Sequence, residues 1–144
     1  MKQSMVLILA VFAAASSISA RLGDTGDQIE DSYGEIVQRR LRDDGLVTVV
    51  YKKDRALFFV TFADGRSISE SYSHVKGNDL SEREIMRFLK ANSARGTWRP
   101  ENTGTTRRFI RSDGKAEAIY ASVNGRPALT VRELHSDHRR GDQR

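Results

Sequence analysis

Cysteine is absent from the 144-residue sequence. No disulfide therefore supports the fold, and packing of the core alone must hold it together. A strong charge of one sign is also lacking, because the formal net charge is +5 and acidic residues are interspersed among the basic ones. This mild charge does not indicate a nucleic-acid-binding protein. The sequence contains no Gly-rich phosphate loop, no Ser-His-Asp order and no Cys-based metal spacing, so neither a cofactor nor a metal is predicted.

Long apolar runs are also lacking. The run at residues 5–15 is about half of the roughly 20 residues that a membrane-spanning helix requires. It follows the positive charge of Lys2 and precedes small residues that end at Ala20, which is the order of a cleavable secretory signal peptide. We therefore expect residues 1–20 to be removed. The mature chain is then expected to be periplasmic or secreted, with no transmembrane segment and no lipid-bearing cysteine at its start.

The mature chain has the length of one small domain. We expect residues 21–134 to form a single α+β domain and the polar residues 135–144 to form a disordered tail. Two helices are predicted, at residues 25–33 and 81–92. Two pairs of residues have the spacing of a capping box, which satisfies free amides of a first helical turn: Thr25 with Gln28, and Ser81 with Glu84.

Three tight hairpins predict antiparallel strand pairing. Their turns are Asp64-Gly65, Asp113-Gly114 and Asn124-Gly125. Strands are predicted where β-branched or alternating segments occur, at residues 46–52, 55–63, 66–75, 106–112, 115–123 and 128–134. The charged residues 38–45 and the Gly- and Pro-containing residues 93–105 are expected to be irregular. The predicted fold class is α+β, an antiparallel β-sheet with two helices packed on one face.

The segment 66–75 alternates strictly between two kinds of side chain. One face carries four serines, which we expect to face water because serines form no core: Ser67, Ser69, Ser71 and Ser73. The other face carries Ile68, Glu70, Tyr72 and His74. A near-repeat is also visible, since residues 62–66 resemble residues 111–115. Such common turn residues also match by chance, so a duplication stays open.

The most informative pattern lies in residues 23–75. It comprises Gly23-x-Thr25, Ile29, Tyr33-Gly34, Tyr51 and Phe62-x-Asp64-Gly65-Arg66. This pattern resembles the helix-opening motif of the β-lactamase-inhibitor-protein-like domains, a group that includes small outer-membrane assembly lipoproteins of Gram-negative bacteria. It is also similar to small exported bacterial α+β proteins of unknown function that share this start.

The resemblance implies an α+β scaffold that binds proteins or envelope components, and it transfers no catalytic residue. The chain departs from the pattern in two places: Tyr33 stands where leucine is usual, and no proline follows Gly34. The lipid-bearing cysteine of the assembly lipoproteins is absent, so their outer-membrane anchor is not implied. The segment from Ser81 onward lies outside the matched part.

Two groups of residues could carry chemistry. Glu70 and His74, on one face of a predicted strand, could form a general acid–base pair or a partly buried polar cluster. The tail segment His135-x-Asp137-His138 offers donors that zinc accepts, but a mobile tail places ligands poorly. Neither group has a partner nucleophile or a complete ligand set, so no catalytic or metal-binding residue is assigned.

The candidate ligand-binding residues are Trp98, Arg99, Arg108 and Phe59. Trp98 with its neighbouring arginines could form a basic, aromatic surface, or Trp98 could close the core over the second helix. Phe59 alternates with Phe58 and Val60, so it should lie on the second face of the sheet. It belongs there either to a docking surface or to a core that later segments cover.

These observations favour an exported, non-enzymatic binding or structural module of the bacterial envelope. Its expected partner is an envelope or extracellular protein. The alternative is a small hydrolase or metal-dependent enzyme that uses Glu70 and His74.

Overall fold

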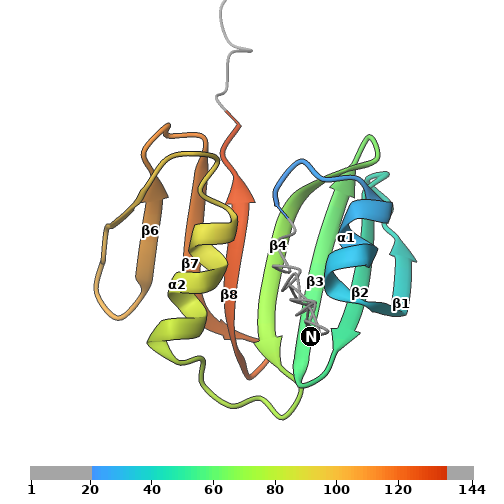
Figure 1. Cartoon of the computed structure of the whole chain (residues 1–144), viewed down its shortest axis with the longest axis horizontal. Coiled ribbons are helices and arrows are strands. Elements are labelled where there is room, and N and C mark those ends of the chain that lie inside the picture. Colours follow the sequence, from blue (N-terminus) through green and yellow to red (C-terminus); the bar gives the residue numbers. More distant parts are fainter. Residues whose placement is uncertain (1–20, 136–144) are drawn as a thin grey trace, which may run out of the picture.

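The computed structural model describes residues 21–135, so the predicted leader and, apart from His135, the predicted tail lie outside the described residues. The chain forms two helices and eight strands within this range (Figure 1). The first half contains α1 (Gly26–Tyr33), β1 (Glu35–Leu41), β2 (Val47–Lys53), β3 (Ala56–Ala63) and β4 (Arg66–His74). The second half contains α2 (Glu82–Ala91), β5 (Trp98–Pro100), β6 (Arg107–Arg111), β7 (Ala116–Val123) and β8 (Arg126–Glu133).

All eight strands form one antiparallel sheet, in the order β1-β2-β3-β4-β8-β7-β6-β5. The α+β class and the antiparallel pairing predicted from the hairpin turns are confirmed. Each half consists of a helix followed by four consecutive strands, and the last strands of the halves, β4 and β8, pair at the centre. The topology of the first half is therefore repeated in the second.

The two turns whose sequences resemble each other do not occupy equivalent positions in the two halves of the fold. Asp64-Gly65 joins β3 to β4, so its counterpart by topology is Asn124-Gly125, which joins β7 to β8. Asp113-Gly114 joins β6 to β7 instead. The match between residues 62–66 and 111–115 is therefore a match between turns that are not equivalent. Asp-Gly recurs because any tight hairpin favours residues that tolerate positive φ.

Both predicted capping boxes are confirmed. Thr25 is the N-cap of α1, where its side chain accepts a hydrogen bond from the Gln28 amide and the Gln28 side chain accepts one from Thr25 N at 2.9 Å. Ser81 and Glu84 have the same relation at the start of α2. Ile85, Phe88 and Leu89 of α2 are buried, whereas Met86 is 57% exposed.

Two segments predicted to be irregular contain strands. Glu35–Leu41 forms β1, which is an edge strand with every residue exposed. Such a strand needs no apolar alternation, and charged side chains are typical of edges, so its sequence resembled a loop. Within residues 93–105, Trp98–Pro100 forms the three-residue β5 at the opposite edge.

The prediction that the serines of β4 face water is wrong for Ser67 and Ser73. Ser67 is 0% and Ser73 is 1% exposed, and Ser69 and Ser71 are half-buried. A bulge shifts the register, because Thr61 pairs with Ser69 whereas Phe62 pairs with Ser67. Directly paired residues share a face, so Ser67 joins the core side. The strand is also central, between β3 and β8, so side chains of a neighbouring strand flank its serines on both sides.

The core contains side chains from both helices and from the inner strands, with Ile29, Tyr51, Val60, Ile85, Leu89 and Leu129 at 0–1% exposure. From α1, the Tyr33 ring packs on Phe58 of β3. From α2, the Phe88 ring packs on Tyr72 of β4. In Figure 1, α1 lies in front of β2 and β3, and α2 lies in front of β7 and β8.

Candidate functional site

The strand register separates the four candidate ligand-binding residues into two groups. Starting from Phe59, the cross-strand pairs run through Ser71, Thr130 and Ile119 to Arg108. Paired residues point to the same face, so Phe59 and Arg108 share one face of the sheet. Arg99 pairs with Ile110, two residues from Arg108, and lies on this face too. Trp98 alternates with Arg99 and points to the opposite face.

Trp98 has a structural role at the end of α2. Its ring packs against the core, and Nε1 donates a hydrogen bond to the Leu89 carbonyl at 2.7 Å. The Arg111 guanidinium carbon lies 6.0 Å from the ring centroid, and Arg111 also donates to the Asn92 carbonyl at 3.0 Å. These contacts agree with the interpretation that Trp98 closes the core over the second helix.

The face that carries Val50, Phe59, Ser71, Thr130 and Ile119 is called the open face. Phe59 is 40% exposed although β3 is an inner strand. The C-terminal strands extend the sheet beside β4 instead of folding over Phe59, so the interpretation of a core covering Phe59 is wrong within residues 21–135. Phe59 and Val50 also border a hollow of about 550 Å³ beneath the β1–β2 loop.

Arginines flank this open face on the side of β6 and β8. Glu117 of β7 is 2% exposed and accepts hydrogen bonds from Arg108 Nε at 2.7 Å and from Arg132. Burial raises the pKa of Glu117, but the two guanidinium groups outweigh this and hold it below its ordinary value. Arg108 also pairs with Glu101 at 2.9 Å. More than half of the Arg132 side chain stays exposed.

Glu70 and His74 are not assembled as an acid–base pair. Glu70 is 0% exposed, and its two oxygens accept hydrogen bonds from Tyr33 Oη at 2.5 Å and from Ser67 Oγ at 3.0 Å. His74 instead contacts Glu84, with 2.6 Å between Nε2 and Oε1. Burial raises the pKa of Glu70 to about 7, against the lowering effect of its two hydrogen bonds. The carboxyl is shut off from solvent, so it cannot exchange a proton directly with a substrate there.

Four aromatic rings bridge the two helices across the sheet. Tyr33 of α1 stacks on Phe58 with 3.8 Å between centroids, and Phe58 packs on Tyr72 at 5.3 Å. Tyr72 then packs on Phe88 of α2 at 5.6 Å. We call this row the aromatic row.

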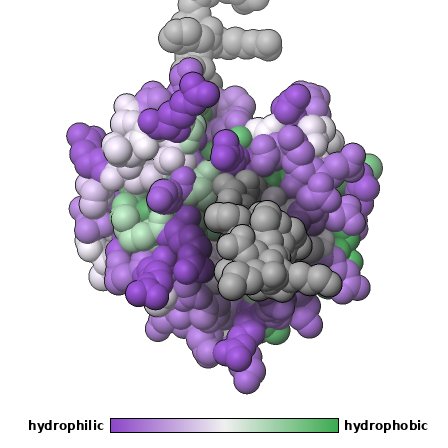
Figure 2. Space-filling view, viewed as in Figure 1, coloured by the Kyte–Doolittle hydropathy of each residue, from purple (hydrophilic) through white to green (hydrophobic). Residues whose placement is uncertain are grey.

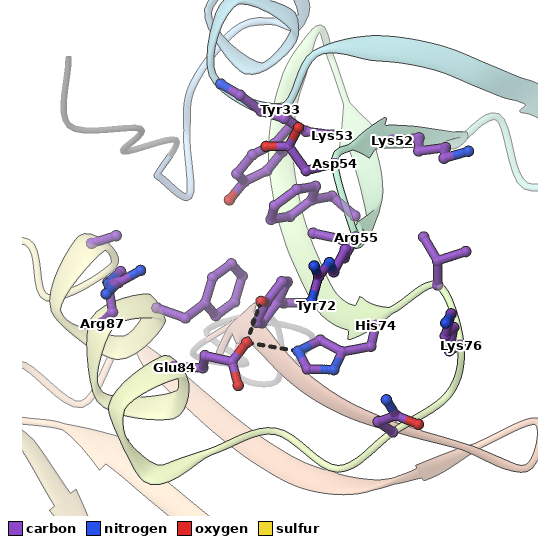
Figure 3. A pocket seen from close by; sticks show the side chains of 16 residues that line it. Tyr33, Lys52, Lys53, Asp54, Arg55, Tyr72, His74, Lys76, Glu84 and Arg87 are labelled. Carbon is purple, nitrogen blue, oxygen red and sulfur yellow. Dashed lines mark hydrogen bonds and ion pairs between the residues drawn. The ribbon is translucent and has the colours of Figure 1, made fainter. Parts of the chain in front are cut away.

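A pocket of about 760 Å³ lies at the aromatic row, next to the turn between β2 and β3. Its volume is in the range of small-molecule binding sites. Figure 3 shows charged groups around it, with Arg87 of α2 on one side and Arg55 and Lys76 on another. Glu70 is not among the residues that line it.

Glu84 holds one wall of this pocket together. Its Oε1 accepts from Tyr72 Oη at 3.0 Å and lies 2.6 Å from His74 Nε2, and its Oε2 accepts from Ser81 N at 2.8 Å and Ser81 Oγ at 2.9 Å. Partial burial raises the pKa of Glu84, but these hydrogen bonds dominate and lower it to about 2. Burial and the bond to Glu84 raise the pKa of Tyr72 to about 12.

Sequence reasoning missed the pocket. Tyr33, Phe58 and Phe88 each matched a core position of a helix or strand, and nothing local in the sequence shows that they meet. Tyr72 and His74 were singled out, but with Glu70 as partner rather than Glu84. The capping-box position of Glu84 was the one available signal, because a capping carboxylate keeps an oxygen free for a second partner.

No group of three or more His, Cys, Asp or Glu side chains in residues 21–135 is placed to hold a metal ion. Asp137 and His138 of the tail motif lie outside the described residues. Neither helix of the described part has the length and apolar character needed to cross a membrane.

Comparison with known proteins gives little further information. No family model matches the chain, and no curated protein matches it. Among solved structures, a crystal structure of a cysteine-rich secretory protein from Staphylococcus aureus subsp. aureus Mu50 is similar, with a TM-score of 0.45 and 12% sequence identity. The similarity covers 77% of this chain and 44% of that chain, so this chain spans less than half of that protein's length.

Proposed function

We propose that the mature chain is an exported, non-enzymatic binding module of the bacterial envelope, and that it docks a partner protein on the open face. One observation carries the proposal: Phe59 is 40% exposed on an inner strand of the sheet. A large aromatic side chain in this position exposes apolar area that a single small domain would otherwise bury. Export rests on the leader pattern of residues 1–20.

The proposal takes both helices to be packed on one face of the sheet, which leaves the other face for a partner. The contacts of β4 support this arrangement. Glu70 and Tyr72 alternate to the same side of the strand, and they contact Tyr33 of α1 and Phe88 of α2, respectively. The resemblance of residues 23–75 to β-lactamase-inhibitor-protein-like domains favours the same type of scaffold.

The partner is proposed to be a folded protein with an apolar centre and acidic residues around it. Val50 and Phe59 pair directly and supply an apolar patch on the open face, and Ile119 adds an apolar position beyond the Ser71–Thr130 pair. Arg99 and Arg132 are exposed at its margin, and Arg guanidinium groups pair bidentately with carboxylates. An apolar centre with a charged rim is the common composition of protein interfaces.

The alternative of a hydrolase or metal-dependent enzyme using Glu70 and His74 has less support. Glu70 is enclosed by Tyr33 and Ser67, and His74 is bound to Glu84. A general acid or base must come within hydrogen-bond reach of the substrate, and the Glu70 carboxyl has no such access.

The proposal is tested by capturing partners from an envelope fraction with immobilised mature protein. The Phe59→Ser variant should lose the captured protein, whereas Met86→Ser should retain it. Met86 is a matched control because it is an exposed apolar residue, at 57% exposure, on α2. Capture should also weaken with added salt, because the arginine contacts are screened.

Two outcomes would count against the proposal. One is equal loss in both variants, or loss in Met86→Ser alone, which would place the partner elsewhere. The other is turnover of a substrate by the mature protein with no captured partner, abolished by Glu70→Gln and His74→Ala, which would favour the enzyme.

A further inference from the structure

The pocket at the aromatic row presents ring edges. Phe58 has Tyr33 on one face and Tyr72 on the other, and Tyr72 lies between Phe58 and Phe88. The faces of these two inner rings are therefore occupied, and what they present to the pocket is their edges. Ring edges carry partial positive charge, so Phe58 and Tyr72 favour electron-rich groups over a cation or a stacked sugar.

The rim of the pocket is mainly basic. Five cationic side chains line it, namely Lys52, Lys53, Arg55, Lys76 and Arg87, against the two acids Asp54 and Glu84. Lys53 Nζ is engaged at the end of α1, where it donates to the Ser32 carbonyl at 3.1 Å. No ion pair within residues 21–135 involves Lys52, Arg55, Lys76 or Arg87. The rim therefore carries more positive than negative charge, and these four cationic side chains form no ion pair in the described part of the chain.

Glu84 does little to reduce this preference for anions. Both of its oxygens are occupied by donors from Ser81, Tyr72 and His74. These donors fill its acceptor positions, so no oxygen is left to accept a hydrogen bond from a cationic ligand. Asp54 is the remaining acid, and it is exposed in the β2–β3 turn. Hydrophilic side chains gather over α2 on the face viewed in Figure 2.

We propose that this pocket binds a small organic anion with an apolar body. The apolar part would lie against the aromatic row, and the carboxylate, sulfonate or phosphate head would meet Arg87, while Arg55 and Lys76 on the other side add positive potential. Both an alkyl anion derived from lipid and an aryl acid have this chemistry. The site lies on the helix-bearing side of the sheet and does not depend on the docking function proposed for the open face.

The test is calorimetric titration of the mature protein at moderate salt. The probes are dodecanoate below its micelle-forming concentration, 2-naphthoate, and dodecyltrimethylammonium as the matched cation. At least one of the two anions should bind, with a Kd at least tenfold lower than that of the cation. Binding of dodecanoate alone identifies the lipid source, and binding of 2-naphthoate alone identifies an aryl acid.

Two variants of α2 provide the residue-level test. Arg87→Glu should raise the Kd of the bound anion at least tenfold, whereas Arg83→Glu should change it less than twofold. The two residues are exposed on the same helix, but Arg83 does not line the pocket. Urea unfolding midpoints equal to that of the wild type would show that neither substitution disturbs the fold. Failure of both anions to bind, equal binding of the cation, or equal effects of the two variants would overturn the proposal. None of these outcomes bears on capture of a partner at Phe59.

Discussion

The hydroxyl of Tyr33, the last residue of α1, donates a hydrogen bond of 2.5 Å to Oε2 of Glu70 on β4. The other Glu70 oxygen accepts from Ser67, which reaches it because of the β4 bulge. A helix end and a strand irregularity thus meet at one buried carboxyl. Burial raises its pKa to about 7, with Asp24 contributing in the same direction and the two hydrogen bonds opposing.

This buried carboxyl should make the protein less stable as the pH rises. The Glu70 pKa is higher in the folded chain than its ordinary value of 4.5, so its contribution is fully present below about pH 4.5 and is lost as the pH rises through 7. Between pH 5 and pH 8 the loss is on the order of 3 kcal/mol. Urea unfolding should show this decline in the wild type, and a smaller one in Glu70→Gln.

Tyr33→Phe provides a second check on the same carboxyl. It removes a hydrogen bond that lowers the Glu70 pKa, so this pKa should rise further. The substitution Tyr33→Phe should consequently lower the free energy of unfolding more at pH 8 than at pH 5. Equal costs at both values, with a flat wild-type profile, would show that Glu70 titrates normally.

The wall residue Glu84 should have the opposite pH dependence. Its pKa is lowered to about 2, so its contribution is present above its ordinary pKa and is lost as the pH falls toward 2. Glu84→Gln should lower the free energy of unfolding at pH 7 by roughly 2 kcal/mol, allowing for its partial exposure. The difference from wild type should shrink near pH 2. A difference that stays constant with pH would contradict this account.

A backbone prediction concerns the link between α1 and β1. Gly34 has φ +85°, and a Cβ there would lie 3.1 Å from the Lys52 carbonyl. Gly34→Ala should therefore cost roughly 1–3 kcal/mol. Gly26→Ala is the control, because no atom lies within 4 Å of a Cβ at this helical position, and it should be neutral or stabilise by up to about 1 kcal/mol. Thermal unfolding of both variants compares them directly.

A stability measurement checks that Phe59 is not a core residue. Since this side chain is 40% exposed, Phe59→Ser should lower the free energy of unfolding by clearly less than the roughly 3–5 kcal/mol that truncation of a core aromatic costs. Phe58→Ser, at a neighbouring position with 8% exposure, should reach that range. Similar losses for the two variants would assign Phe59 to the core.

Local chemistry in the sequence was sufficient to predict much of the fold. The Asp64-Gly65 turn and the Ser81 capping box depend on neighbouring residues, and both are present. β1 was missed because an exposed edge strand carries no apolar alternation. The bulge opposite Thr61 was missed because register depends on the partner strand, and this one shift moved Ser67 into the core.

The candidate sites were harder to predict for a related reason. Alternation correctly separated Phe59 from Phe58, but whether anything covers Phe59 depends on where distant strands go. Tyr33 and Phe88 come from different helices and meet through β3 and β4. The pocket is therefore a property of the tertiary fold, and no short sequence motif predicts it.

The most direct test of the central proposal is hydroxyl-radical footprinting of the mature protein, alone and with its captured partner. The account predicts that Phe59 loses reactivity in the complex while Met86 on α2 keeps the reactivity that it has alone. Protection of Met86 with no change at Phe59 would place the partner on the helices and contradict docking on the open face.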